Sequence, residues 1–358
     1  MKIATTLKSQ KLQNIVREVG INPNYWYPVA WADRLKSAQV MAVIIWKQAI
    51  AIYRDRNGQL HALEDACPHK GVALHKGEVH GSNLVCPYHG WEFNESGECV
   101  SIPYLPLKQK LPCATVRSYP VREQYGMIWV FPGDPTLAAN CPLPNVPEYN
   151  DPDWFVVPIP AHFQAHFSIC NENTMDVFHG HLHKNLQGWF DPVLLNLSQT
   201  ESSVYADYRV SYQQGMLAKL LGLTEPGKQI NTRTVSIQYD YPHYHSSLEG
   251  ISSIYLMWLP VSPTETRSFS LLFVKIPLPQ WLIKPIQKQL ATLIWHFLLK
   301  KFLEQDIEMI ESEQRTYLNN PQRQYVEINP AIIALERVIV SQYEKFMSRS
   351  SQSPAVKS

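Results

Sequence analysis

The sequence predicts an α+β protein in which a small all-β metal-binding domain comes first and a sheet with helices packed on it follows. Residues 26–132 are rich in β-branched and aromatic residues separated by turn sequences, which is typical of short strands. Residues 133–153 contain five prolines and indicate a crossing between domains. Beyond them, strand-like alternation over 202–277 gives way to helical periodicity over 286–318.

The bulk properties restrict the class of protein. A chain of 358 residues with 45% hydrophobic and 18% charged residues suits two domains that each bury a core. A formal net charge of +1 provides no strong field for nucleic acid or an acidic partner. Six cysteines are far below the density of a disulfide scaffold. Because residues 1–13 lack an apolar signal core, a cytoplasmic, reducing compartment is expected, where cysteines more often bind metal than pair.

Short antiparallel strands are expected in the first domain. Residues 41–46 and 49–53 are rich in β-branched and aromatic side chains, and Asn57-Gly58 supplies turn chemistry before a strand at 59–63. A further hairpin is expected to turn at residues 94–97. This pattern predicts a loop-rich β domain.

The second domain is expected to mix helices and strands. A helix is predicted over residues 169–184, and strands include 235–239 and 254–258. The Ser-rich tail from Arg349 has the composition of a disordered segment. The expected boundaries are, in order, a lead-in at 1–25, the all-β metal domain at 26–140, the second domain at 150–345 and a disordered tail at 346–358.

Four metal-binding side chains stand in two short motifs sixteen residues apart. Cys67-Pro-His69 is followed by Cys86-Pro-Tyr-His89, so two thiolates and two imidazoles are available for either zinc or a [2Fe–2S] cluster. A Cys₂His₂ zinc finger would carry both histidines on one helix, whereas here each histidine sits beside a cysteine on a loop. A glycine follows each motif and lets backbone amides approach bridging sulfides, which favours the iron–sulfur cluster.

A second group of polar residues stands in the helix expected near the start of the second domain. One face of that helix, at about 100° per residue, carries Asn173, Asp176, His179 and His183. His179 and His183 are four residues apart and can direct two imidazoles at one ion, while His181 lies nearly opposite. Two histidines and one carboxylate with open positions form the ligand set of non-haem Fe(II) oxygenases.

The third ligand must come from elsewhere in the fold, and the helix around residues 300–318 offers Asp306. Asp306 shares a face with Leu303 and Ile310, and a carboxylate on an apolar face is costly unless it meets a cation. Periodicity alone leaves two interpretations equally open: an inward-facing ligand, or a residue of a solvated helix surface.

These motifs resemble those of the oxygenase, or alpha, component of Rieske non-haem iron oxygenases. Residues 67–69 and 86–91 are similar to the cluster motif of that family, and residues 24–30 are similar to the entry into its first domain. Respiratory-type Rieske proteins carry an additional cysteine pair, and the matching positions here are Val72 and Tyr88, which cannot form a disulfide. This difference favours the oxygenase branch, with a [2Fe–2S] cluster on the two Cys-His motifs.

The resemblance extends to the second domain. Residues 173–179 are similar to the mononuclear-iron motif of the family, and residues 304–306 resemble its late acidic ligand. The resemblance therefore implies that His179, His183 and Asp306 hold a mononuclear Fe(II). Many members separate the two histidines by four residues, whereas three separate them here, a spacing that some members share; helical geometry favours His183 over His181.

The family also implies an architecture and an inter-site contact. It implies a helix-grip (START-like) catalytic domain with an antiparallel sheet and C-terminal helices, assembled as a head-to-tail homotrimer. The cluster of one subunit would then serve the iron of the next. Asp176 would bridge the sites by accepting hydrogen bonds from the partner subunit's His89 and from His179 of its own chain, with Asn173 in the same catalytic motif.

The resemblance implies an oxygenase that uses O₂ to hydroxylate or demethylate an aromatic or polycyclic organic substrate. A monooxygenase or demethylase is expected in preference to an enzyme that dihydroxylates a ring. The chain lacks a G-x-G-x-x-G dinucleotide loop, so electrons are expected from a separate reductase or ferredoxin. Three alternatives are an electron-transfer-only Rieske protein, a zinc-binding interaction module and an oxygenase of the chlorophyll-breakdown (pheophorbide oxygenase) type. Members of that last group commonly carry a C-terminal membrane extension with a Cys-x-x-Cys pair, which this sequence lacks.

The segment from Trp281 to Phe302 alternates apolar residues with lysines. Such a stripe most often packs in a core or at a subunit contact. A peripheral membrane contact is the alternative, and it would suit a lipophilic substrate.

Overall fold

The computed structural model describes residues 12–106, 109–183, 189–213, 230–248, 251–275 and 284–352. The chain forms two compact units. One unit contains residues 22–143, and the other contains residues 144–358 together with the N-terminal residues 1–21. Among the described residues, no helix has both the length and the apolar composition to span a membrane.

The unit at residues 22–143 is built from three small antiparallel sheets. Their strand orders are β1-β10-β9, β2-β3-β4 and β5-β6-β7-β8. The bounds are β1 Tyr27–Trp31, β2 Gln39–Ile45, β3 Gln48–Arg54, β4 Leu60–Glu64, β5 Glu78–His80, β6 Asn83–Val85, β7 Glu92–Phe93, β8 Cys99–Ser101, β9 Val121–Gln124 and β10 Met127–Val130. The three strands predicted between residues 41 and 63 are confirmed as β2, β3 and β4, and the hairpin predicted at 94–97 joins β7 to β8.

The core of this unit reaches the metal-binding loops directly. Fully buried side chains from β3, β4, β6 and β7 pack in one cluster with the two cysteines of the motifs: Tyr53, Leu63, Leu84 and Phe93 surround Cys67 and Cys86. The loops are therefore attached to rigid strands rather than to a mobile surface, which suits a site that must hold four ligands in place.

The larger unit contains a seven-stranded antiparallel sheet with the order β11-β17-β16-β15-β14-β13-β12. Its strands are β11 Phe155–Phe163, β12 Trp189–Gln199, β13 Ser203–Gln213, β14 Ile230–Asp240, β15 His243–Leu248, β16 Ser252–Ser262 and β17 Glu265–Val274. Strands from β13 to β17 follow one another as a meander, and β11 pairs with β17 in a continuous register from Phe155 to Phe163. The expected strands at 235–239 and 254–258 lie within β14 and β16.

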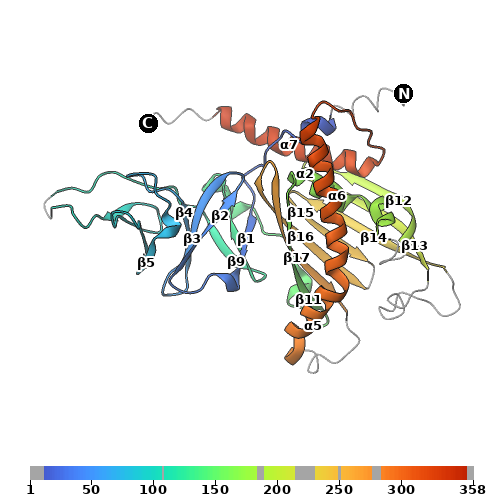
Figure 1. Cartoon of the computed structure of the whole chain (residues 1–358), viewed down its shortest axis with the longest axis horizontal. Coiled ribbons are helices and arrows are strands. Elements are labelled where there is room, and N and C mark those ends of the chain that lie inside the picture. The colour runs from blue at the N-terminus through green and yellow to red at the C-terminus, as the bar shows by residue number, and fades with distance from the viewer. Residues whose placement is uncertain are drawn as a thin grey trace. The chain divides into compact units, whose positions relative to one another are not determined.

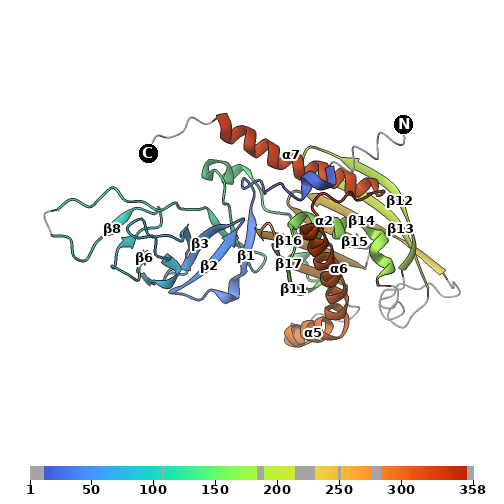
Figure 2. The same ribbon diagram turned by 45° about the horizontal axis from the view of Figure 1, so that its top comes forward.

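Helices α2, α6 and α7 lie on this sheet (Figures 1 and 2). The helices and 3₁₀ segments are η1 Ala32–Arg34, η2 Leu74–Lys76, η3 Pro135–Asn140, η4 Pro147–Tyr149, α2 Phe167–Met175, η5 Val177–His181, η6 Lys284–Ile286, α5 Gln287–Ile294, α6 Lys300–Asn319 and α7 Pro330–Gln352. A π-helical turn, η7 (Trp295–Leu299), joins α5 to α6. In both views α6 crosses the strands, while α2 contacts α6, α7 and strands β16 and β17.

Two helical expectations need correction. The continuous helix predicted over residues 169–184 is wrong in its second half, because α2 ends at Met175 and Asp176 adopts an extended conformation. The Asp176 side chain accepts a hydrogen bond from the Phe178 backbone N–H and so starts a separate 3₁₀ turn. At the other end of the chain, α7 includes residues 346–352, which were expected in a disordered tail, and residues 353–358 lie outside the described residues.

Candidate metal centres

The two Cys-His loops have the same backbone geometry. In the first, the Cys67 N–H donates to the Val72 carbonyl (2.9 Å) and the Gly71 N–H donates to the Cys67 carbonyl (2.7 Å). In the second, the Cys86 N–H donates to the Trp91 carbonyl (2.8 Å), and the matching glycine N–H donates back to Cys86 (3.1 Å). Each glycine has φ near +68°, a left-handed conformation that glycine adopts without a steric penalty.

The four ligand side chains of these loops converge. The buried thiols of Cys67 and Cys86 are hydrogen-bonding neighbours, and burial, with Cys86 beside it, raises the pKa of Cys67 to about 11. The rings of His69 and His89 lie 4.6 Å apart, and His69 stacks on Trp91 at 4.8 Å. Among the described residues, the buried Nδ1 atom of His89 has no hydrogen-bond partner, so this nitrogen is left available for a metal. Two close thiols with two imidazoles on one side fit a [2Fe–2S] cluster with mixed ligands.

The second site begins at the end of α2, where Asp176 is held from three elements. Its carboxylate accepts hydrogen bonds from the Phe178 N–H of η5 (3.0 Å) and from the Asn329 side-chain amide (3.2 Å). The Asn329 amide oxygen in turn accepts from the Tyr208 hydroxyl on β13 (3.2 Å) and from the Ala331 N–H at the start of α7 (3.0 Å). The position of Asp176 is therefore fixed by the 3₁₀ turn, the sheet and α7 together.

His179, His183 and Asp306 come together although 123 residues separate His183 from Asp306. The Asp306 Oδ1 atom lies 3.0 Å from His183 Nε2 and 3.7 Å from His179 Nε2. One ligand atom from each residue lies within 4.8 Å of the other two. Metal–ligand bonds of about 2.0–2.2 Å at roughly right angles place neighbouring ligand atoms about 3 Å apart, so this group fits a mononuclear ion.

The surroundings of the two imidazoles direct the same nitrogen atom, Nε2, of each ring toward Asp306. The Nδ1–H of His183 donates to the Gln305 side-chain oxygen (3.0 Å), and its ring stacks on Phe302 at 3.7 Å. The Nδ1–H of His179 donates to the Asp176 backbone carbonyl. Both Nε2 atoms therefore face Asp306 as ligand atoms, and their orientation is fixed by a second hydrogen bond, as is usual for metal-bound histidines. Burial lowers the pKa of His183, but the hydrogen bond and charge of Asp306 outweigh it and leave that pKa raised.

The remaining predicted residues lie close by but outside this group. Asn173 lines a cavity of about 360 Å³ together with Asp176 and His179. His181 is exposed and does not belong to the group of ligand atoms. Sequence reasoning missed four orienting neighbours: Phe302 and Gln305, which contact His183, and Asn329 and Tyr208, which hold Asp176. Of these, only Phe302 and Gln305 stand near a predicted ligand in sequence, on the same helix as Asp306.

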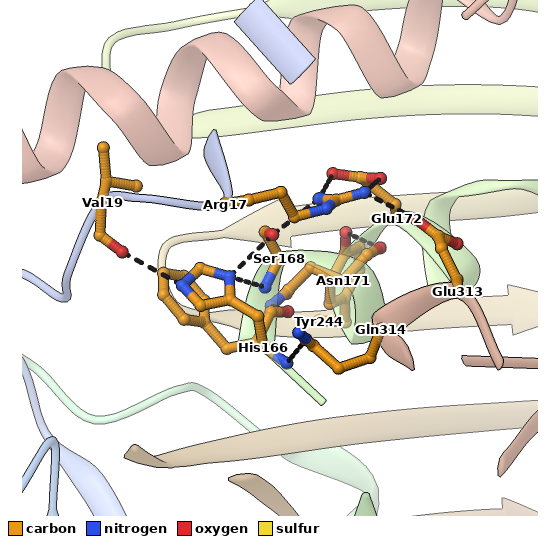
Figure 3. A network of polar contacts seen from close by, with 10 residues as sticks. Arg17, Val19, His166, Ser168, Asn171, Glu172, Tyr244, Glu313 and Gln314 are labelled. Atoms are coloured by element: carbon orange, nitrogen blue, oxygen red, sulfur yellow. Dashed lines mark hydrogen bonds and ion pairs between the residues drawn. The ribbon is translucent and has the colours of Figure 1, made fainter. Parts of the chain in front are cut away.

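A buried polar network anchors α2 to the N-terminal segment (Figure 3). The guanidinium group of Arg17 pairs with both carboxylate oxygens of Glu172, donates to the Ser168 hydroxyl (2.7 Å) and contacts Glu313 on α6 (2.7 Å). Ser168 bonds His166 Nδ1 (2.8 Å), while His166 Nε2–H donates to the Val19 carbonyl (3.1 Å). Burial, with the Arg17 charge nearby, lowers the pKa of His166 to about 3, so its imidazole is neutral.

Comparisons with known proteins show which family the chain belongs to. Two family models match the chain: the Rieske [2Fe-2S] domain at residues 25–120 and the vanillate O-demethylase oxygenase C-terminal domain at residues 163–339. A 4β-methylsterol monooxygenase of Methylococcus capsulatus is 35% identical over 350 residues, which cover 95% of this chain and 94% of that protein. The chain belongs to the Rieske non-haem iron oxygenases.

Two further relatives place this Rieske oxygenase in context. Chlorophyllide a oxygenase of Arabidopsis thaliana is 27% identical over 310 residues, and the match covers 83% of this chain but only about half (53%) of that protein. The crystal structure of dicamba monooxygenase bound to 3,6-dichlorosalicylic acid aligns with a TM-score of 0.74 at 21% identity, covering 94% of this chain and 100% of the other. At that identity the structural match shows the fold alone.

The matches confirm the predicted family, its α+β fold and its O₂-using oxidoreductase activity. Together with the group of His179, His183 and Asp306, they also confirm the two iron cofactors predicted from the sequence. They exclude the electron-transfer-only protein and the zinc-binding module as descriptions of the whole chain, because both leave the second iron site unused.

Proposed function

We propose that this Rieske oxygenase is a monooxygenase that oxidises a C–H bond, foremost a methyl group, of an apolar polycyclic substrate of the sterol type. The grouping of His179, His183 and Asp306 in a chain that also carries the Cys-His loops is the observation that supports an oxygenase centre. The similarity to a 4β-methylsterol monooxygenase runs through nearly the full length of both chains and supports the substrate class.

The proposal assigns the seven predicted ligand residues to two iron centres. Cys67, His69, Cys86 and His89 would hold the [2Fe–2S] cluster, and His179, His183 and Asp306 would hold the mononuclear iron. When bound, the two iron centres supply electron storage and O₂ activation. In the net reaction, one oxygen atom of O₂ enters the substrate C–H bond and the other leaves as water, with two electrons from a reductase or ferredoxin and two protons from solvent.

The protein's own contribution at the iron site is orientation and open space. Three ligands on one side leave other positions for small molecules, which is the property that two histidines and a carboxylate provide. Gln305 and the Asp176 carbonyl fix the tautomers of the two imidazoles, and Phe302 stacks on His183. A second cavity, of about 280 Å³, lies beside η5 and is lined mainly by apolar side chains, including Val177, Phe178, Phe190, Pro192 and Val210. We assign the apolar substrate to this cavity.

We infer that Asp176 connects the two redox sites across a subunit boundary in a head-to-tail trimer. Its carboxylate is ordered by Asn329 and by the Phe178 N–H, and it lines the cavity of about 360 Å³ that also contains His179 and Asn173. In the trimer, this carboxylate would accept a hydrogen bond from His89 of the partner subunit. Within its own chain, Asp176 meets His179 through its backbone carbonyl and not through the carboxylate expected from the sequence. The carboxylate suits the contact with the partner because a charge-assisted hydrogen bond to an imidazole is short and directional.

Isotopic product analysis tests the reaction. The purified chain, a surrogate ferredoxin–reductase pair and ¹⁸O₂ would be incubated with a 4-methylsterol, and in parallel with methoxy-aromatic, N-methyl and ring-fused aromatic compounds. We expect one labelled oxygen in an oxidised methyl group of the sterol. Two labelled oxygens on one substrate would contradict monooxygenation, and turnover confined to small aromatic compounds would contradict the sterol-type substrate.

The likeness to chlorophyllide a oxygenase makes a chlorophyll-type tetrapyrrole the second candidate substrate. The match leaves about half of that protein uncovered, which makes it the weaker support. Including chlorophyllide a and pheophorbide a in the same incubation distinguishes the two. Faster oxidation of either tetrapyrrole than of the sterol would favour this second candidate.

A further inference from the structure

The helical segment α5–η7, from Gln287 to Leu299, has an inner apolar stripe that packs against the sheet. Leu290, Ala291 and Ile294 pack against Phe155 and Val157 on β11. A helix at the edge of a sheet ordinarily presents a single apolar stripe to the core and polar residues to water. The inner stripe of α5 meets that expectation.

Beside this inner stripe lie three more apolar side chains, one on the preceding turn η6 and two on the segment itself. Ile286 and Leu293 are each 52% exposed, and Phe297 is 79% exposed. The three positions are spaced by seven and four residues, so they follow one line along the helix. We call this line the outer apolar face. Three large exposed side chains in one line differ from the scattered single exposures that are common on protein surfaces.

The charged residues in the sequence around the outer apolar face are mostly lysines. From Lys275 through Leu303 the sequence contains no aspartate or glutamate. Lys288, Lys300 and Lys301 are exposed within this stretch, and Lys300 pairs with Glu304, the first acidic residue that follows it in sequence, at 3.7 Å. The chain as a whole has a net charge of only +1, so this concentration of positive charge is local.

We propose that the outer apolar face, with its lysines, docks the enzyme on the surface of an anionic lipid membrane. An interfacial helix buries apolar side chains at the acyl boundary while lysines reach the lipid phosphates, and both parts are present here. Exposed apolar side chains near several lysines complement an anionic lipid bilayer, which is apolar inside and negatively charged at its surface. The proposal goes beyond the proposed function and does not depend on it, although a membrane would be a source of sterol-type substrates.

Co-sedimentation of the full chain with lipid vesicles tests the docking. Vesicles of phosphatidylcholine with about 30% phosphatidylglycerol would be compared with vesicles of phosphatidylcholine alone. We expect preferential binding to the anionic vesicles that weakens as salt is added. The double variant Leu293→Ser/Phe297→Ser should lower the partition coefficient about tenfold or more, because two buried apolar side chains are lost. Lys300→Gln/Lys301→Gln should weaken binding to anionic vesicles only.

The matched control is Met347→Ser on α7, which removes another exposed apolar side chain and should leave binding unchanged. Circular dichroism and iron content establish that each variant is folded. Failure of the wild type to bind anionic vesicles, or equal binding by the Leu293/Phe297 variant, would overturn the proposal. So would light scattering that shows a changed oligomeric state in that variant with unchanged binding, since the face would then be a subunit contact. Turnover of a water-soluble substrate is independent of docking and separates this failure from failure of the proposed function.

Discussion

Replacing Arg17 by methionine should destabilise the catalytic unit more than any substitution of an exposed arginine. Arg17 belongs to the N-terminal segment, yet its guanidinium group bonds Glu172 and Ser168 on α2 and Glu313 on α6. Its side chain is 8% exposed, and that of Glu172 is 11% exposed. The change to methionine keeps most of the apolar volume and removes only the cation.

The loss of stability is set by the unpaired Glu172 carboxylate that the substitution leaves behind. Without Arg17, the Glu172 carboxylate is left in a poorly solvated site and loses both of its charge-assisted hydrogen bonds to the guanidinium group. Removing one partner of a buried ion pair typically costs about 3–5 kcal/mol. For a unit of this size, about 1 kcal/mol lowers the melting temperature by about 2–4 °C, so the expected loss is on the order of 10 °C.

Thermal unfolding monitored by circular dichroism measures this loss. Arg315→Met is the matched control, because Arg315 is 63% exposed and its nearest carboxylate oxygen, on Glu311, lies 3.8 Å away. An exposed pair of this kind contributes about 0–1 kcal/mol, so that variant should melt close to the wild type. Adding Glu172→Gln to Arg17→Met should recover part of the loss, because the unpaired charge is removed. Equal melting temperatures for the Arg17 and Arg315 variants would refute the reasoning.

Three other outcomes are expected. Glu336 on α7 is fully buried, and burial, with Glu172 nearby, raises its pKa to about 9, so the folded state favours the neutral acid. Its stabilising contribution is complete below the ordinary pKa of 4.5 and is lost as the pH rises through about 9. Glu336→Gln should therefore melt near the wild type at about pH 5 and above it at about pH 8–9, and parallel pH profiles would contradict this assignment. Gly90→Ala should reduce cluster content and stability by more than Gly71→Ala, because both have φ of +68° but only at Gly90 would a Cβ approach Pro103 to 2.9 Å; equal visible absorbance and melting for the two variants would argue against this contact. Asp176→Asn should retain both iron centres and reduce turnover about 10- to 100-fold, with the loss in electron transfer measured as slower cluster reoxidation by O₂ in the presence of substrate; reoxidation at the wild-type rate would rule out a bridging role.

The sequence predicted correctly those features whose interacting residues are neighbours along the chain. Each Cys-His motif carries its ligands within four residues and its turn glycine one or two residues after the histidine, so the loop geometry follows from the sequence. The strands at residues 39–64 are hairpin neighbours rich in β-branched and aromatic residues. These features could be predicted because they do not depend on distant partners.

The rest depended on contacts between distant segments. Asp306 is 123 residues from His183, and its helical periodicity left its orientation open until the resemblance to a family was considered. The break after Met175 arises because the Asp176 side chain competes for the Phe178 N–H and is held by Asn329, a residue 153 positions away. Arg17 was expected in a loose lead-in, and no local pattern indicates that it pairs with Glu172.

The central claim is that one chain holds both a mixed-ligand iron–sulfur cluster and a separate iron on His179, His183 and Asp306. Determination of iron and acid-labile sulfide in the reconstituted wild type and in Asp306→Ala tests it most directly. We predict about three irons and two sulfides per wild-type chain, and about two irons with two sulfides and an unchanged visible spectrum in the variant. A wild-type chain with only two irons, or a variant that retains the third, would contradict the claim.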